Sequence, residues 1–263
     1  MPHNIPLLGL GTWGMGGRFE RDESNNKESL KALRHGISLG FRLIDTAEMY
    51  GAGGAEEIVG EAMQAIPREE IFLVSKVWKD HLLRDDVVAA ATQSLKRLKT
   101  DYLDLYLVHW PSDTIPLSET MPAMEELVKQ GLVRNIGVSN FTVPLLEEAA
   151  RYLKGTSIFA NEIEYNLSNQ SAAKDVIPFC QKNDIKIIAY RPLAKGALGT
   201  SSNDLVIKLA KKYQKTPTQI ALNWLISQDI VAIPKATSQA HLQENWGVLG
   251  WKMEEEDVAA LKE

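Results

Sequence analysis

The chain has 263 residues and a net charge of −5, with 44% hydrophobic and 24% charged residues. This globular composition excludes wholesale disorder, and the mild acidity excludes a basic surface for nucleic acid or anionic lipid. One cysteine, Cys180, suits a reducing compartment. Because no signal peptide and no apolar stretch of about 18 residues is present, we expect a cytoplasmic protein without a membrane span.

Short apolar runs rich in β-branched residues alternate with amphipathic segments along the whole chain. Several runs are apolar at nearly every position, as in parallel strands buried on both faces. Helical periodicity is clearest in 27–40, 55–66, 85–99 and 204–215. The predicted strands are 7–13, 42–47, 71–77, 102–110, 133–139, 158–166, 185–193 and 230–236.

Helix-start signals agree with this alternation. Asn25 with Glu28 three residues later predicts a capping box, and Thr216 places Pro217 at a first helical position. Two predicted helices, 216–228 and 253–263, exceed one helix per strand. In the second, the acidic run 254–257 falls in the first turn, where the helix dipole favours negative charge.

The number of strands decides between architectures. Eight strands in 263 residues give a spacing of roughly 33, the length of one βα unit. No linker rich in proline, glycine or serine divides the chain. The sequence therefore predicts an α/β protein with one (β/α)8 TIM barrel domain spanning 1–263 and two additional helices.

A glycine motif near the start suggests a different fold. Gly9, Gly11 and Gly14 match G-x-G-x-x-G after a strand, the fingerprint of a doubly wound dinucleotide-binding domain. That motif requires its last glycine to open a helix whose N-terminus meets the pyrophosphate. Here the helix is postponed to about Asn26, and bulky Trp13 occupies the turn, which favours a loop on the barrel's top face.

Chemistry concentrates at the C-terminal ends of the predicted strands, where barrel enzymes place their active sites. These ends carry polar, ionisable and aromatic residues, whereas the ends of purely structural strands would show no such preference. Tyr50 lies five residues past Asp45, in the following loop. The residues at the strand ends are Thr12, Trp13, Asp45, Lys76, Trp78, His109, Trp110, Ser139, Asn140, Glu162, Tyr190 and Lys235.

Four of these residues form a coherent proton-transfer unit. Tyr50 is a proton donor for a developing alkoxide, and the ammonium of Lys76 lowers the pKa of a neighbouring tyrosine. Asp45 keeps a buried Lys76 charged, and His109 orients a carbonyl oxygen. The alternatives are a structural Asp45–Lys76 ion pair and a core histidine. Four such residues at successive strand ends favour the functional interpretation.

These residues carry a family resemblance. The segments DTAEMYG, SKVW, LYLVHWP, GVSNF, NEIEYN and IPKAT occur in this order and resemble the aldo-keto reductases over nearly the whole chain. The resemblance implies a (β/α)8 barrel that reduces carbonyls with a nicotinamide cofactor and no metal. It also implies Tyr50 as general acid, Lys76 and Asp45 as its tuning pair, and His109 as the residue that orients the carbonyl.

The resemblance implies the remaining site residues as well. Around the cofactor they are Thr12, Trp13, Asp45, Ser139, Asn140, Glu162 and Tyr190 at the nicotinamide end, Leu193 and Gly196 near the pyrophosphate, and Lys235, Ser238, His241, Glu244 and Asn245 at the adenosine end. The substrate pocket is expected to be lined by Trp13, Tyr50, Trp78, His109 and Trp110. Trp224, Trp246 and Trp251 suit the core.

Two departures from the family pattern bear on function. Glu162 stands where the family usually has Gln, and we hypothesise that its charge favours the protonated form of Tyr50, which shifts the optimum for reduction to higher pH. His241 stands where an arginine usually binds a 2′-phosphate, and a neutral imidazole does not replace a guanidinium. With Lys235 retained, we expect NADP(H) to be preferred and NAD(H) to be accepted less well. The side chain of Arg191, which follows Tyr190, is a further source of positive charge.

The chain is short for the family, with a brief segment after Trp110 and an end soon after the last helix. We therefore expect an open pocket, small aldehydes and ketones as substrates with keto sugars among the candidates, and a monomer or weak oligomer. The chain resembles compact microbial members that reduce diketogluconate. The alternatives are a regulatory binding protein similar to potassium-channel β subunits, and a metal-dependent hydrolase, whose histidine spacings are absent.

Overall fold

The computed structural model describes residues 5–196 and 203–262. Eight parallel strands, β1 to β8, form one sheet in which each strand pairs with the next along the chain. The strands are β1 (Leu10–Gly11), β2 (Leu43–Asp45), β3 (Phe72–Val77), β4 (Leu103–Val108), β5 (Val133–Ser139), β6 (Ile158–Glu164), β7 (Lys186–Tyr190) and β8 (Val231–Ala232).

The first and last strands join to close the sheet into a barrel. Leu8 forms a parallel bridge with Ala232. The amide of Gly9 donates to the carbonyl of Ala232 at 2.9 Å, the amide of Ala232 donates to the carbonyl of Leu7 at 2.8 Å, and the amide of Gly11 donates to the carbonyl of Pro234 at 3.2 Å. This junction, which we call the β1–β8 seam, confirms the predicted (β/α)8 barrel.

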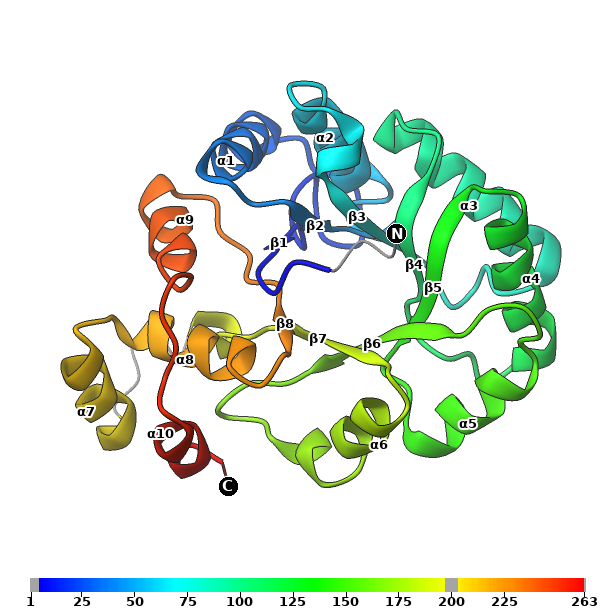
Figure 1. Cartoon of the computed structure of the whole chain (residues 1–263). Coiled ribbons are helices and arrows are strands. Elements are labelled where there is room, and N and C mark those ends of the chain that lie inside the picture. Colours follow the sequence, from blue (N-terminus) through cyan, green and yellow to red (C-terminus); the bar gives the residue numbers. More distant parts are fainter. Residues whose placement is uncertain (1–4, 197–202, 263) are drawn as a thin grey trace.

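Helices surround the strands (Figure 1). In the part of the chain that the structure describes, one α-helix follows each of the first six strands, two follow β7, and α9 and α10 follow β8, which confirms the two additional helices. Short 3-10 helices lie at Arg68–Glu70 and Ser171–Lys174. The helices are α1 (Asn26–Leu39), α2 (Gly54–Met63), α3 (Arg84–Leu98), α4 (Leu117–Lys129), α5 (Val143–Arg151), α6 (Val176–Lys182), α7 (Asp204–Tyr213), α8 (Pro217–Ile226), α9 (Gln239–Trp246) and α10 (Glu255–Ala260).

The predicted helix starts are right in position, but one capping interaction is wrong. Thr216 and Gln219 form a capping box at α8, with Pro217 at the first position. Asn25 is the N-cap of α1, but its φ of −111° and ψ of 14° are not extended, and its side chain makes no capping hydrogen bond. The acidic residues of α10 lie in its first turn, as expected. The last residue of the predicted helix 253–263 lies outside the described residues.

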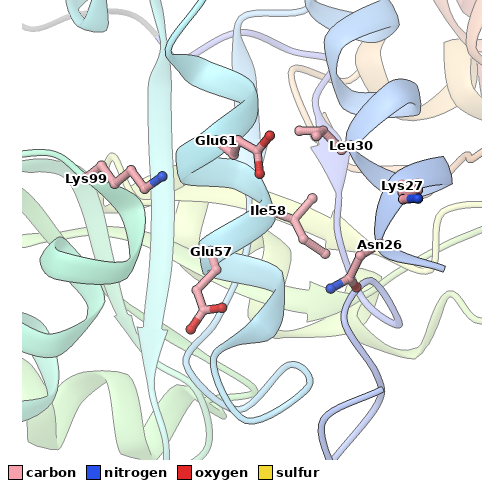
Figure 2. A pocket seen from close by; sticks show the side chains of 7 residues that line it. All are labelled: Asn26, Lys27, Leu30, Glu57, Ile58, Glu61 and Lys99. Atoms are coloured by element: carbon pink, nitrogen blue, oxygen red, sulfur yellow. The ribbon is translucent and has the colours of Figure 1, made fainter. Parts of the chain in front are cut away.

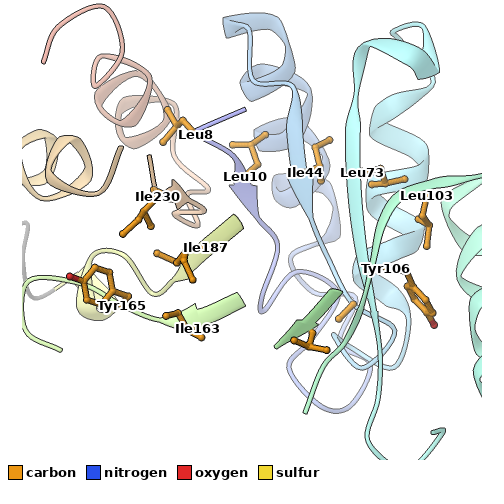
Figure 3. Close-up of a cluster of buried hydrophobic side chains, with 14 of the residues drawn as sticks. Leu8, Leu10, Ile44, Leu73, Leu103, Tyr106, Ile163, Tyr165, Ile187 and Ile230 are labelled. Carbon is orange, nitrogen blue, oxygen red and sulfur yellow. The ribbon is translucent and has the colours of Figure 1, made fainter. Parts of the chain in front are cut away.

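Alternation along the strands separates two cores. One set of side chains fills the barrel interior and comprises Ile5, Leu43, Phe72, Val74, Leu105, Leu107, Ala160, Ile188, Val231 and Ile233. The other set faces the helices and includes the residues labelled in Figure 3, among them Leu73, Tyr106 and Ile187. Strands covered on both faces read as continuous apolar runs, which explains why their pattern was visible in the sequence.

Tyr102 joins two arginines at the N-terminal end of the barrel. The guanidinium of Arg68 lies 4.0 Å from the centre of the Tyr102 ring, and that of Arg134 lies 3.9 Å from it. Asp104 accepts hydrogen bonds from both, at 2.7 Å from Arg68 and 3.2 Å from Arg134, and from the amide of Leu73 at 3.0 Å. This cluster ties β3, β4 and β5 together at the end opposite the predicted site.

A cavity of about 450 Å³ lies on the outside of the barrel between α1 and α2 (Figure 2). Its lining mixes the lysines Lys27 and Lys99 with the carboxylates of Glu57 and Glu61. Since charges of both signs line it, it shows no preference for an ion of either sign. Among the described residues, no helix has the length and apolar character needed to cross a membrane.

Candidate active site

Alternation along the strands carries the site residues into the barrel mouth. Residues two positions beyond the interior core residues point the same way. Leu43 is therefore followed by Asp45, Val74 by Lys76, Leu107 by His109, Ala160 by Glu162 and Ile188 by Tyr190. The predicted strands 42–47, 102–110 and 230–236 extend beyond the observed strands at both ends.

Lys76 lies at the centre of the cluster and is fully buried. Its Nζ is 2.7 Å from both carboxylate oxygens of Asp45 and donates to the carbonyl of Thr46 at 3.0 Å. The hydroxyl of Tyr50 lies 3.4 Å from the same nitrogen. Thr12, also buried, donates to the backbone carbonyl of Asp45 at 2.9 Å. The structure thus brings Asp45, Tyr50 and Lys76 together as expected.

The pKa values in this cluster agree with the expectation only in part. Burial opposes the charged form of Lys76, but Asp45, Glu162 and Tyr50 together outweigh it and raise its pKa, so the side chain is an ammonium ion. Burial raises the pKa of Tyr50 above its usual value of 10. The charge of Lys76 acts in the opposite direction but is the smaller effect, so the pKa remains raised. The expected net lowering is therefore wrong for the protein without ligand, and Tyr50 keeps its proton at neutral pH.

His109 is a buried, neutral imidazole. Burial, and then the charge of Lys76, lower its pKa well below 6.5. Its Nδ1 is buried without a hydrogen-bond partner among the described residues. At neutral pH the ring therefore carries one N–H and can donate a hydrogen bond without bringing a charge to the site.

An unbroken run of edge-to-face aromatic contacts borders Tyr50. Ring centres are 5.4 Å apart for Phe19 and Trp13, 5.0 Å for Trp13 and Tyr50, 5.6 Å for Tyr50 and His109, and 5.2 Å for His109 and Trp78. Phe19 is 65% exposed. The sequence analysis missed this residue, because its contact with Trp13 depends on the path of the loop after β1.

Trp110 lies at the same rim and is 41% exposed. Trp78 is anchored by Glu48, whose carboxylate accepts from the Trp78 amide at 2.7 Å and lies 2.9 Å from Nδ1 of His81. Trp13 and Trp78 are half-buried, so all three predicted pocket tryptophans are at least partly exposed. Trp224, by contrast, is fully buried against Tyr165, as expected of a core residue.

The polar end of the mouth is formed by β5, β6 and β7. Tyr190 donates to Oδ1 of Asn140 at 2.9 Å, and Asn140 donates to Oγ of Ser139 at 2.9 Å and to the carbonyl of His109 at 3.2 Å. Asn140 has a φ of 63°, a conformation that asparagine tolerates better than most residues. The amide of Asn140 donates to the carbonyl of Glu162 at 2.8 Å, which places this strained residue directly beside β6.

Glu162 completes the cluster from β6 and is 2% exposed. Its Oε1 is 3.5 Å from Nζ of Lys76, and its Oε2 is buried without a partner among the described residues. Burial and the neighbouring Asp45 raise its pKa well above 4.5. This unpartnered oxygen lies beside Ser139 and Tyr190 and could accept a hydrogen bond from a polar ligand group. The site is therefore compatible with the carboxamide of a nicotinamide ring.

Comparisons with known proteins place this site in a family. The sequence model of the aldo/keto reductase family matches residues 7–263. The chain belongs to the aldo/keto reductase family. It is therefore an oxidoreductase, as the resemblance of its motifs implied.

Individual relatives cover almost the same length. The chain is 42% identical over 262 residues to methylglyoxal reductase YeaE of Escherichia coli, covering 98% of this chain and 90% of that protein. It is 34% identical to glyoxal reductase of Bacillus subtilis, covering 97% of this chain and 87% of that protein.

Solved structures agree in fold. The thermostable aldo-keto reductase Tm1743 bound to epalrestat superposes with a TM-score of 0.93 at 45% identity, covering 98% of this chain and 94% of that one. The Klebsiella pneumoniae aldo/keto reductase in complex with NADP and acetate has a TM-score of 0.89 at 39% identity, covering 98% of this chain and 90% of that one.

The aldo/keto reductase residues expected near the pyrophosphate lie in the loop after β7. Leu193 is half-buried, Gly196 is exposed, and between them Ala194 and Lys195 adopt φ values of 46° and 59°. Left-handed residues in succession are costly for side chains with a Cβ, which is typical of loops shaped for a ligand. Arg191, considered above as a source of positive charge, instead forms an ion pair with Glu164 at 2.9 Å.

The residues expected at the adenosine end follow β8 into α9. Ser238 caps α9 by accepting from the amide of His241 at 3.2 Å. Ser238, His241 and Lys235 are exposed, Glu244 is half-buried and Asn245 is buried. These residues form one continuous segment, although Asn245 reaches the surface only to a small extent.

Lys235 has a cationic neighbour that the sequence analysis missed. Although Lys235 is exposed, partial loss of solvent around its ammonium, and then repulsion from Arg18 in the loop after β1, lower its pKa. Among the described residues neither cation has a carboxylate within ion-pair distance. Because the positive charge of Arg18 disfavours the charged form of Lys235, an anionic ligand group near both side chains would be favoured. No sequence signal marked Arg18, because its partner is 217 residues away.

No group of three His, Cys, Asp or Glu residues in the described part of the chain is arranged to bind a metal ion.

Proposed function

We propose that this protein reduces small aldehydes and ketones to alcohols, with NADPH as the hydride donor. The observation that carries the proposal is the buried chain Asp45–Lys76–Tyr50 at an open aromatic rim, with contacts of 2.7 Å and 3.4 Å. The similar proteins named for methylglyoxal and glyoxal reduction support short ketoaldehydes and dialdehydes as the first substrates to test, with keto sugars as further candidates.

Each residue has a defined role in this proposal. The bound nicotinamide would supply the hydride for the carbonyl carbon. Tyr50 donates its proton to the carbonyl oxygen, and the nearby ammonium of Lys76 stabilises the phenolate that this leaves. Asp45 keeps Lys76 charged and fixed. His109, neutral at pH 7, donates a hydrogen bond that orients the carbonyl, while Trp13, Trp78 and Trp110 border the substrate.

The cofactor-binding roles follow the same geometry. Ser139, Asn140 and Glu162 offer polar groups for the carboxamide, and the Tyr190 ring offers a stacking face. Thr12 and Asp45 lie beside the site expected for the ribose, Leu193 and Gly196 beside the pyrophosphate, and the segment from Lys235 to Asn245 beside the adenosine.

For the choice between NADP(H) and NAD(H), we propose that Lys235 and Arg18 together attract a 2′-phosphate. This compensates in part for His241, so that NADPH is preferred and NADH is used less well. Lys235→Met should weaken NADPH binding by at least about tenfold and leave NADH binding nearly unchanged, since a phosphate contact with a cation contributes about 1.5–3 kcal/mol. Equal losses for both cofactors would contradict the assignment.

The proposed activity is tested by the loss of NADPH absorbance with a panel of methylglyoxal, glyoxal, simple aldehydes and keto sugars. Tyr50→Phe should lower kcat by roughly 10²–10⁴-fold while NADPH still binds. Tyr165→Phe is the matched control, because Tyr165 is also buried but stacks on Trp224 in the outer core. Equal turnover by wild type and Tyr50→Phe would refute the assigned acid. Cofactor binding without turnover of any carbonyl would favour a regulatory binding protein.

A further inference from the structure

The barrel mouth contains one buried cation and two buried carboxyl groups. Asp45 takes both short contacts with Lys76, at 2.7 Å to each of its oxygens. Glu162 approaches the same nitrogen only to 3.5 Å, through Oε1. Two ionised carboxylates beside one ammonium would leave a net negative charge in a site from which water is excluded, a costly arrangement.

Within residues 5–196 and 203–262, no other group near Glu162 supplies the missing positive charge. Asp45 and Lys76 face it from β2 and β3, and the neutral phenols of Tyr50 and Tyr190 face it from the loop after β2 and from β7. Its partners in the sheet are Ser139 in β5 and Ile188 in β7. His109, at the end of β4, stays neutral beside Lys76.

The surroundings of Glu162 therefore favour its acid form. Its Oε2 is buried and unpartnered among the described residues, and its carboxyl group shares the single ammonium of Lys76 with Asp45, which makes the shorter contact. Burial and Asp45 raise its pKa well above 4.5. Buried glutamic acids in other proteins titrate as high as about 8–9, so a proton held at neutral pH is within the known range.

We propose that Glu162 is a redox-coupled proton site: it keeps its proton in the free enzyme and with NADPH, and releases it when NADP⁺ binds. The inference rests on the proposed function, which brings the nicotinamide to this carboxyl group. The oxidised ring carries a positive charge and the reduced ring does not. Only the oxidised ring therefore supplies the second cation that an ionised Glu162 lacks. The proton leaves the carboxyl group for solvent, and no other bond changes.

The coupling also changes the hypothesis drawn from the sequence. An ionised Glu162 would favour the protonated form of Tyr50, but a protonated Glu162 adds no charge to that hydroxyl. In the NADPH complex, Glu162 therefore favours the protonated form of Tyr50 only at pH values above the pKa of Glu162, where the carboxyl group is ionised.

The pH dependence has a definite sign. Below the pKa of Glu162 in the free enzyme, NADP⁺ binding releases a proton, so NADP⁺ affinity rises with pH by up to about tenfold per unit. NADPH affinity has no such dependence. The ratio of the two dissociation constants isolates the effect, because groups at the adenosine end, including His241 and the 2′-phosphate, meet both cofactors alike.

The experiment measures dissociation constants for NADP⁺ and NADPH between about pH 6 and 9 by quenching of tryptophan fluorescence. Calorimetry in buffers of different ionisation enthalpy counts released protons directly and needs no variant. We expect Kd(NADP⁺)/Kd(NADPH) to fall by about tenfold per unit over at least one pH unit, with up to one proton released on binding NADP⁺. Glu162→Gln, which keeps the size and hydrogen-bonding capacity of the side chain, should abolish both effects.

Glu164→Gln is the matched control. It removes a carboxyl group two residues along the same strand, from a side chain that is partly exposed and paired with Arg191. This variant should retain the slope. A ratio independent of pH in the wild type, or a slope that persists in Glu162→Gln, would overturn the proposal while leaving the proposed function intact. Failure of the wild type to bind either nucleotide would overturn both.

Discussion

Removing Lys76 and removing Asp45 should have unequal effects on stability, although the two residues are partners. Lys76→Met leaves Asp45 and Glu162 buried, 2% exposed each, with no cation. Loss of one partner from a buried ion pair costs about 3–5 kcal/mol of unfolding free energy. Asp45→Asn leaves Lys76 with Glu162, whose oxygen is already 3.5 Å away. Glu162 then gives up its proton and becomes the counter-ion, so we expect a loss of only about 1–2 kcal/mol for the altered hydrogen bonds.

The pH dependence of Lys76→Met follows from the same charges. Without the ammonium, Asp45 and Glu162 both keep protons in the folded state and lose them on unfolding above about pH 6. Groups whose folded pKa is raised stabilise the protein at low pH, and the stability is lost as pH rises towards that pKa. Because the variant binds about one proton more than wild type when folded, its stability should fall more steeply, by about 1.4 kcal/mol per pH unit.

Urea unfolding followed by tryptophan fluorescence measures both effects, with transitions recorded at about pH 7 and 8. In this range the imidazole of His109 is largely neutral in the folded and unfolded states and does not contribute. Equal destabilisation by Lys76→Met and Asp45→Asn would show that Glu162 does not replace Asp45. A Lys76→Met variant with the pH dependence of wild type would show that the buried carboxyl groups do not gain the extra proton.

Three further predictions concern parts of the fold away from the mouth. Asp104→Asn should lower the free energy of unfolding by about 2–3 kcal/mol, because a neutral amide replaces the charged acceptor of Arg68 and Arg134. The value of kcat should not change, because Asp104 lies at the end of the barrel opposite the proposed site. A kcat lowered tenfold would contradict the separation of the two barrel ends. In the same urea assay, Gly40→Ala should lower the free energy of unfolding by about 1–3 kcal/mol more than Gly131→Ala. Both residues have positive φ, but a Cβ at Gly40 would lie 2.7 Å from the Trp246 ring, whereas one at Gly131 would meet nothing within 4 Å. Cys180 is fully buried and burial raises its pKa to about 11, so a thiol reagent at pH 8 should modify it only after denaturation; rapid labelling of the native protein would refute its burial.

The sequence predicted the strands well because their local and tertiary signals coincide. Strands such as β4 are covered on both faces, so an apolar run marks them without knowledge of their partners. The same logic placed Asp45, Lys76, His109 and Glu162 at one rim. Strand ends were less predictable: β1 and β8 contain two paired residues each, where runs of seven were expected. Pairing depends on how neighbouring strands diverge, which is a property of the closed barrel.

Interactions between distant segments could not be predicted in the same way. The proximity of Arg18 to Lys235, and the contact of Phe19 with Trp13, depend on the path of the loop after β1. The pKa of Tyr50 was expected to fall because Lys76 was considered without the accompanying desolvation. The extent of desolvation depends on the whole fold, so its effect on the pKa of Tyr50 could not be judged from the sequence even though the neighbouring residues were predicted. The single-domain assignment, the oligomeric state and the individual residue roles remain predictions.

The β1–β8 seam is the junction at which the two ends of the sheet meet. Here the sheet is joined through two of its shortest strands, whereas β4 and β5 share a ladder five residue pairs long. Thr12 lies on the β1 side of the seam and Lys235 on the β8 side, so a nucleotide bound to both would connect the first and last strands of the barrel. The cofactor would then stabilise the closed barrel as well as supply hydride, because it would bind groups at both ends of the sheet.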